Sequence, residues 1–235
     1  MRTHFIFLIV LILLYNFSFA QYIGWEEIDE SKVKPWTDHH SAYQYVYHFG
    51  ESEGESDLLV LSVGNKLYVQ IKQGSFSDDG MSFLWDYRNL TNVRVEGNKF
   101  YSDAFTGEFV TYNDGERDVP GLKIDNPWSG MPVDGKYEIG LQSYMVADYF
   151  AGKYPQASRR ALSIEELKGM SAKELKIMRN EIFARYGYTF IPGGTMDTYF
   201  RQQDWYRAEH KNVDSFLTEL EKQNIKLIQQ VEAEK

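Results

Sequence analysis

Three adjacent residues, Asp38, His39 and His40, form the densest group in this chain that is suited to acid–base chemistry or metal binding. Side chains of neighbouring residues on an extended segment point to opposite faces, so adjacent histidines seldom ligate the same ion. We therefore expect a solvated loop here, and we assign no metal site and no catalytic residue to it.

Acidic side chains spaced by serine and glycine form a second candidate group. Their spacing allows weak Ca²⁺ binding, but it is more typical of an exposed turn that guards the end of a hairpin. The same interpretation applies to a pair of neighbouring aspartates. The residues concerned are Glu51, Glu53, Glu55, Asp57, Asp78 and Asp79.

Motifs of the common enzyme classes are absent from the sequence. It contains no Gly-x-Ser-x-Gly, no His-Glu-x-x-His, no phosphate-binding loop and no EF-hand loop. It also contains no cysteine, which excludes a thiol nucleophile, a disulfide and a lipidated cysteine anchor. We expect no cofactor and a function in binding. Because paired glycosidase carboxylates leave no local spacing to recognise, a secreted hydrolase of glycan or peptide stays open as an alternative.

The first 20 residues show the order of properties of a cleavable secretory signal. Arg2 supplies a positive start, and residues 5–15 form an uncharged apolar run that is too short for a stable membrane anchor. Ser18 and Ala20 place small residues before a cleavage site between Ala20 and Gln21. We expect export to the periplasm, the cell surface or the medium.

The charge and the periodicity of the chain indicate its partners and its architecture. A formal net charge of −9 argues against nucleic acid as a partner. After the signal (1–20), apolar residues first alternate with period two and later recur every three or four residues. We predict an α+β fold with an antiparallel β domain (21–125), a loop-rich connecting segment (126–160) and an all-helical domain (161–235).

Two copies of a hairpin pattern occur in the β domain. Residues 58–63 and 66–72 flank the turn Gly64-Asn65, and residues 93–101 repeat the pattern around a second Gly-Asn pair. Further strands are predicted over about 43–49, 82–85 and 107–112. Seven or eight short strands of this kind predict a meander that closes into a small barrel or a sandwich. One face of the first hairpin carries Leu67, Val69 and Ile71, and the other carries Tyr68, Gln70 and Lys72.

Aromatic residues of the connecting segment are suited to sealing one part of the protein onto the other. A ligand-binding surface is the alternative, but no polar residues converge beside them in the sequence. These residues are Tyr144, Tyr149, Phe150 and Tyr154.

Local signals define the helices of the last part. Capping boxes at Ser163–Glu166 and Ser171–Glu174 predict two helix starts eight residues apart. A final amphipathic helix is expected to begin near Asn212 or Asp214.

The second of these helices should end at a glycine. Glu181 and Arg185 have the i,i+4 spacing of an ion pair. Gly187 fits the left-handed residue of a Schellman motif, which would bring Tyr188 onto Phe183.

This helix and the residues after it resemble the YARHG domain, a module of bacterial exported or surface proteins. The naming motif corresponds to residues 183–187, with Phe183 in place of the family tyrosine and Tyr186 in place of its histidine. The resemblance spans about 162–232. Besides the stretch Met178–Tyr188, it includes Phe190, Gly193, Gly194, Met196, Asp197, Tyr199, Phe200, Trp205, Tyr206, Asn212 and Val213.

The resemblance implies an extracytoplasmic binding or scaffolding module, because the family carries no established activity. Replacement of the motif histidine by Tyr186 removes the one motif residue that titrates near neutral pH, which weakens a catalytic interpretation. Most of the motif also has a purely structural explanation as helix stop, ion pair and core. If the module itself binds a ligand or partner, the candidate residues are Arg179, Asn180, Arg185, Tyr186, Trp205 and Tyr206.

We therefore expect an exported bacterial protein that acts as a binding or scaffolding module at the cell envelope. The expected partner is a component of the envelope or another exported protein, and the sequence leaves the oligomeric state open. Besides the hydrolase, a lipocalin-like carrier of an apolar ligand is an alternative, which requires an open barrel interior.

The first prediction concerns the N-terminus of the exported chain. Protein recovered from an envelope or secreted fraction should begin at Gln21, because the small residues at positions 18 and 20 direct cleavage there. N-terminal sequencing measures this directly. A chain recovered from that fraction with residues 1–20 still attached would contradict the prediction.

Overall fold

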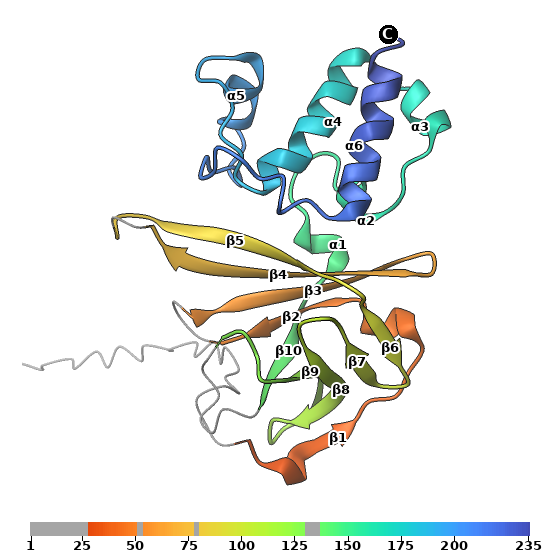
Figure 1. Cartoon of the computed structure of the whole chain (residues 1–235), viewed down its shortest axis with the longest axis vertical. Coiled ribbons are helices and arrows are strands. Elements are labelled where there is room, and N and C mark those ends of the chain that lie inside the picture. Colours follow the sequence, from red (N-terminus) through yellow and green to blue (C-terminus); the bar gives the residue numbers. More distant parts are fainter. Residues whose placement is uncertain (1–27, 51–53, 78–79, 130–136) are drawn as a thin grey trace, which may run out of the picture.

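A computed structural model describes residues 28–50, 54–77, 80–129 and 137–235. A curled β-sheet forms one layer, and helices from the C-terminal part pack on its outer side over β3, β4 and β5 (Figure 1). Several residues considered above lie outside the described ranges, namely the whole predicted signal with Ala20 and Gln21, and Glu51, Glu53, Asp78 and Asp79.

The described strands belong to one antiparallel sheet of ten strands. Their order is β5-β4-β3-β2-β10-β9-β8-β7-β6, with β1 paired to β8. The strands are β1 (Val33–Pro35), β2 (Tyr45–Phe49), β3 (Ser56–Val63), β4 (Lys66–Phe76), β5 (Phe83–Leu90), β6 (Arg94–Glu96), β7 (Lys99–Tyr101), β8 (Thr106–Asn113), β9 (Asp118–Asp125) and β10 (Tyr137–Met145).

The antiparallel β architecture is as predicted, but the sheet is a half-barrel. Within the described residues its two end strands, β5 and β6, are not paired with each other, and no second sheet faces it to make a sandwich. Strand β10 lies between β2 and β9 and joins the meanders β2–β5 and β6–β9 into one sheet. The sheet thus extends to Met145, beyond the boundary predicted at residue 125.

Both predicted hairpins are present. The first joins β3 to β4, with Val63 opposite Lys66 and Gly64 at a φ of 59°. The second joins β6 to β7, with Gly97 at a φ of 62°. A positive φ at the first turn residue favours glycine, which is consistent with the recurrence of the Gly-Asn order.

The concave face of the sheet is filled by large side chains. The rings of Tyr43 and Phe109 stack with their centroids 3.9 Å apart, and the hydroxyl of Tyr47 donates to the carbonyl oxygen of Tyr43 over 2.9 Å. The interior is therefore a packed core. Its buried members include Tyr43, Tyr47, Phe49, Leu58, Val60, Ile71, Phe100, Phe109, Leu122 and Ile124.

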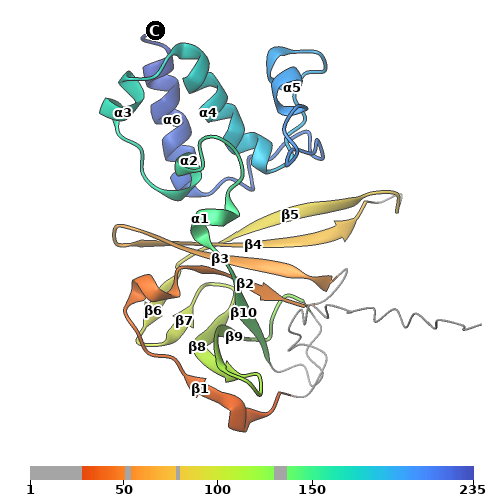
Figure 2. The ribbon, with the colours of Figure 1, turned by 180° about the vertical axis from the view of Figure 1, so that it is seen from behind.

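The convex face is also partly buried, because the helices pack against it (Figure 2). Leu220 packs there against Val46, Leu59 and Leu61 of β2 and β3. Two aromatic residues of the connecting segment, Tyr149 and Phe150, join this cluster. They have the docking role predicted for them, whereas Tyr144 is 56% exposed and Tyr154 belongs to the helical core.

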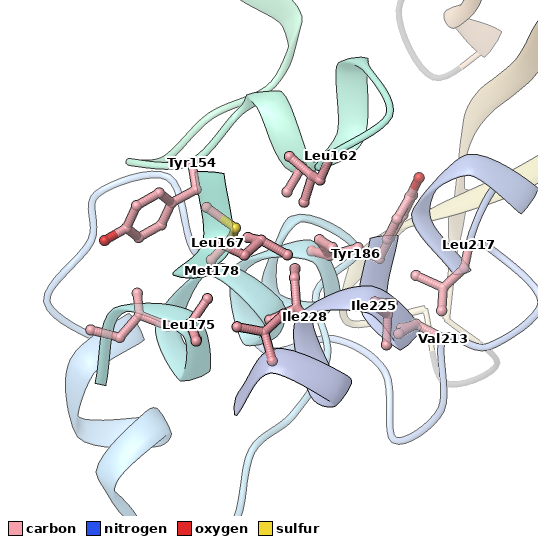
Figure 3. Close-up of a cluster of buried hydrophobic side chains, with 14 residues drawn as sticks. Tyr154, Leu162, Leu167, Leu175, Met178, Tyr186, Val213, Leu217, Ile225 and Ile228 are labelled. Atoms are coloured by element: carbon pink, nitrogen blue, oxygen red, sulfur yellow. The ribbon is translucent and has the colours of Figure 1, made fainter. Parts of the chain in front are cut away.

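The regular elements after β10 are all helices. Between the last two of these helices, residues 201–218 contain no helix. The predicted all-helical domain is therefore only partly confirmed. Figure 3 shows the apolar core between them, including Leu175, Met178 and Ile228. The helices are α1 (Val146–Tyr149), α2 (Gln156–Arg159), α3 (Ile164–Lys168), α4 (Ala172–Arg185), α5 (Thr195–Phe200) and α6 (Glu219–Glu232).

The local signals at α3 and α4 are confirmed. Both capping boxes are formed in full, at Ser163 and at Ser171. Helix α4 ends in a Schellman motif, in which the amide of Tyr188 donates to the carbonyl of Phe183 over 3.2 Å and Gly187 has a φ of 70°. The ring centroids of Phe183 and Tyr188 are 6.0 Å apart, so the predicted contact between these residues is formed.

Helix α6 begins later than predicted, at Glu219 instead of near Asn212 or Asp214. A third capping box is formed there, with Thr218 as the N-cap and Glu221 as its partner. The preceding segment stays non-helical because a side chain of strand β5 binds its backbone. The side-chain amide of Asn89 donates to the carbonyl oxygens of residues 215–217, at 3.1–3.3 Å.

Candidate functional site

A hollow of about 370 Å³ lies between the convex face of the sheet and the helices. Strands β4 and β5 line one wall, and the end of α4 with the loop after α5 lines the other. Its side chains are mainly aromatic, with several charges among them. We call it the first hollow; it is lined by Gln70, Lys72, Phe83, Trp85, Tyr87, Tyr149, Phe150, Ala151, Ala184, Arg185, Tyr186, Gly187, Trp205, Arg207 and Glu209.

The sheet wall follows from strand pairing. Gln70 and Lys72 alternate along β4, and the residues opposite them on β5 are Asn89 and Tyr87. Directly paired residues share a face, so these side chains and Trp85 all point outward to the helices. The face of the first hairpin that carries Gln70 and Lys72 is thus where the helices and the hollow lie.

The helix wall is held by a buried ion pair. Arg185 at the end of α4 pairs with Glu181 one turn earlier, as predicted from their spacing, and the two side chains are only 6% and 1% exposed. Arg185 also donates from Nε to the carbonyl of Ala151 (2.6 Å) and from Nη1 to Oγ of Ser158 (2.9 Å). Burial lowers the pKa of the Arg185 guanidinium, and the charge of Glu181 opposes that shift.

Backbone amides complete the environment of Glu181. The amides of Lys153 and Tyr154 donate to its two carboxylate oxygens over 2.9 and 2.6 Å. Gly152 lets the chain pass this close: a Cβ there would lie 2.4 Å from the carboxylate carbon, and its φ is 106°. The connecting segment is thereby bound to α4 through a charge that has no access to water.

Tyr186 links both helices to the sheet. Its hydroxyl lies 2.8 Å from Oε2 of Glu221 in α6 and 3.2 Å from Oε1 of Gln70 in β4. Burial raises the pKa of the Tyr186 phenol and also raises the pKa of the fully enclosed Glu221 carboxyl. Edge-to-face contact with Tyr87, at 4.7 Å between ring centroids, fixes the orientation of the Tyr186 ring.

The loop after α5 covers the free edge of the sheet. The amide of Trp85 in the edge strand β5 donates to Oε2 of Glu209 (3.3 Å), and Nε2 of His210 donates to the carbonyl of Trp85 (2.9 Å). Pairing of this kind protects an edge strand from adding another chain.

A second hollow of about 330 Å³ adjoins the first and shares Lys72, Trp85 and Tyr149 with it. The amino group of Lys72 stands over the Trp85 ring, 4.1 Å from its centroid. The second hollow is lined by His48, Glu55, Ser56, Asp57, Lys72, Trp85, Tyr144, Asp148 and Tyr149.

A histidine–carboxylate pair is the main polar feature of the second hollow. Nδ1 of His48 lies 2.9 Å from Oδ1 of Asp57, and Nε2 lies 4.0 Å from Oε2 of Glu55. The hydrogen bond to Asp57 raises the pKa of His48, and partial burial opposes this shift.

Comparison with known families identifies the helical wall. Residues 152–233 are a YARHG domain. The match starts at Gly152, earlier than the resemblance at about 162, and so includes the segment that enfolds Glu181. No curated protein and no solved structure matches the chain.

Three of the six predicted binding residues of the YARHG domain meet in one place. Arg185, Tyr186 and Trp205 line the first hollow. Tyr186 forms part of the wall of the hollow but is itself buried, with only 4% of its surface exposed. The domain motif thus lies at the contact with the sheet.

The other three candidates lie outside both hollows. Arg179 pairs with Glu232 over 2.9 Å, and the amide of Asn180 donates to the carbonyl of Lys176 within α4. Tyr206 is 6% exposed, and its hydroxyl donates to the carbonyl of Tyr188. Arg179 and Asn180 instead line a separate hollow of about 300 Å³ within the YARHG domain, and Tyr206 is part of the packing of that domain.

The sequence did not point to the sheet side of the site. Lys72, Trp85 and Tyr87 come from two strands, and only strand pairing brings them together with the YARHG domain. One feature of the sequence could have indicated this side of the site: the polar face of the first hairpin, where Gln70 and Lys72 alternate with apolar residues.

The segment Asp38–His40 forms a local turn. Asp38 accepts the amide of His39, and His39 caps the short 3₁₀ helix at His40–Tyr43 through its contact with Ser41. Across the described residues no group of three or more histidine and acidic side chains is arranged for a metal ion. In that same part of the chain, none of the helices has the length and apolar character to cross a membrane.

The buried ion pair generates a prediction of stability. Arg185→Met leaves the Glu181 charge buried without its partner, so the free energy of unfolding should fall by about 3–5 kcal/mol. Adding Glu181→Gln should cost less than the sum of the two single changes. Urea unfolding measures all three variants.

The exposed pair Arg160–Glu166, 2.7 Å apart, is the matched control for the buried pair. Arg160→Met should cost at most about 1 kcal/mol. Equal losses for Arg160→Met and Arg185→Met would show that burial of the Glu181–Arg185 pair has no special role.

Proposed function

We propose that the protein is an exported binding protein of the cell envelope, and that its ligand lies in the groove formed by the first and second hollows. The observation that carries this proposal is the composition of the first hollow, whose walls come jointly from the sheet and from the motif of the YARHG domain. Binding sites commonly lie at such boundaries between two parts of a fold.

The groove has the size and the rigidity that binding requires. Each hollow has a volume within the range of small-molecule sites, about 300–1,000 Å³. The hydrogen bonds of Tyr186 to Gln70 and Glu221 hold the two walls in a fixed relation. A wall that is already ordered loses little conformational entropy when a ligand binds.

Export is supported by the leader-like first 20 residues and by the presence of a YARHG domain. The carrier alternative lacks support, because the concave face of the sheet is filled by side chains such as Tyr43, Tyr47 and Phe109. A lipocalin-like carrier would need that space for its ligand.

Blocking the first hollow should abolish binding. Ala151 lines it, and Ala151→Trp places an indole in the space while the backbone carbonyl that binds Arg185 is retained. Separate glycan, peptide and lipid fractions of the envelope are titrated against the mature chain by calorimetry. We expect the unaltered protein to bind one fraction and the variant to lose at least about tenfold in affinity, equivalent to 1.4 kcal/mol.

The matched control is Ala104→Trp, an exposed position on the loop between β7 and β8, outside both hollows. Its affinity should equal that of the unaltered protein, and thermal unfolding of both variants establishes that they are folded. Equal affinity of Ala151→Trp, or no binding to any fraction, would refute the proposal.

The His48–Asp57 pair favours hydrolysis as a second candidate function. In the second hollow, Asp57 orients the imidazole while Nε2 faces Glu55, an arrangement suited to general-base catalysis. Neutral imidazole is the active form of such a base. Because the Asp57 hydrogen bond raises the pKa of His48, the rate should rise with pH above the ordinary histidine value of about 6.5.

A panel of glycan and peptide substrates tests this candidate. His48→Gln should lower turnover at least about 100-fold, whereas His39→Gln, a change in the exposed turn, should leave it unchanged. Turnover that survives His48→Gln, or a panel without any turnover, would exclude His48 as a catalytic base.

A further inference from the structure

The amino group of Lys72 is a positive charge placed between the two hollows. It lines both of them, and among the described residues no carboxylate pairs with it. The guanidinium of Arg207, which lines the first hollow, likewise has no hydrogen bond or ion pair within that part of the chain. Two free cations in one groove stand out in a chain of net charge −9.

Among the side chains that line the first hollow, positive charges therefore outnumber negative ones. Arg185 adds little to its charge, because the buried Glu181 neutralises it. Glu209 is engaged by the backbone amide of Trp85 and lies 3.8 Å from His210. Lys72 and Arg207 remain to attract an anionic group.

The second hollow carries more negative than positive side chains. Three carboxylates, Glu55, Asp57 and Asp148, line it together with His48 and with Lys72, which both hollows share. Asp57 is paired with His48, whereas the exposed Asp148 has no partner among the described residues. Asp148 is thus available to a cationic group, and Glu55, whose Oε2 lies 4.0 Å from Nε2 of His48, lines the same hollow.

The aromatic side chains shared by the two hollows, Trp85 and Tyr149, already contact other residues of the protein. Lys72 lies over one face of Trp85, and the rings of Phe83 and Trp85 are nearly perpendicular with centroids 5.3 Å apart. Tyr149 packs edge-on against Phe150. One face of Trp85 is therefore occupied by Lys72, and matching of charge is the stronger basis for recognition.

We propose, on the basis of the binding function proposed above, that the groove takes a short peptide with free termini. Its terminal carboxylate binds Lys72 and Arg207 in the first hollow, and its terminal ammonium binds Glu55 and Asp148 in the second. Trp85 and Tyr149 contact the apolar part between the termini. Three extended residues span about 10 Å, which makes a tripeptide a suitable probe.

The probe is Ala-Leu-Ala in four forms: free at both termini, acetylated at the N-terminus, amidated at the C-terminus, and blocked at both. Binding to the full mature chain is measured by calorimetry. The free form should bind saturably, and each block should weaken binding at least about tenfold, as expected for loss of a charge-assisted hydrogen bond.

Variants assign each terminus to its hollow. Lys72→Gln should weaken the acid forms at least about tenfold and leave the amidated forms unchanged, because the amide offers no charge for Lys72 to bind. Asp148→Asn should weaken the forms with a free ammonium and spare the acetylated ones. Lys66→Gln, an exposed change at the start of the same strand β4, is the matched control and should affect no form.

The outcomes separate this inference from the proposed function. Equal affinity of all four peptide forms, or equal effects of Lys72→Gln on acids and amides, would overturn the inference. If the free tripeptide fails to bind while a glycan or lipid fraction still binds in a manner sensitive to Ala151→Trp, the groove is a binding site for another class of ligand. Failure of every fraction and every peptide would overturn both proposals.

Discussion

The buried ion pair between Glu181 and Arg185 constrains the course of the chain around it. A carboxylate that is only 1% exposed needs hydrogen bonds on both oxygens, and here the amides of Lys153 and Tyr154 provide them in addition to the guanidinium. The connecting segment must therefore fold over α4, with glycine at position 152 because a side chain there would collide with the carboxylate. Strand β10, which leads into this segment, is thereby joined to the helices.

A second set of buried polar contacts joins the helices to the sheet. Tyr186 reaches Gln70 and Glu221, and Gln70 donates to the carbonyl of Phe216 over 2.6 Å while Asn89 binds the same carbonyl. Each of these groups would be costly to bury alone, and the hydrogen bonds between the sheet and the YARHG domain reduce that cost. These contacts hold the sheet and the helices in a fixed relation. The groove lies beside them, where the two parts no longer touch.

The two faces of the sheet have different roles as a result. The concave face holds a packed aromatic core and leaves no space for a ligand along Tyr43, Tyr47 and Phe109. The convex face of β4 and β5 carries Gln70, Lys72 and Trp85, and it is only partly covered by the YARHG domain. The two hollows with charged and aromatic linings therefore lie on the outside of the half-barrel, at the boundary between the sheet and the helices.

The sequence by itself determined the features that depend on neighbouring residues. Capping boxes at Ser163 and Ser171, the glycine turns of the hairpins, the Glu181–Arg185 pair and the end of α4 at Gly187 follow local rules, and all are present. Only the tertiary structure decided the place of β10 in the sheet, the start of α6 at Glu219 and the meeting of Lys72 with the YARHG motif. These depend on pairing between segments far apart in the chain, because the hydrogen bonds of Asn89 and the burial of Gln70 exist only after the sheet and the helices have packed together.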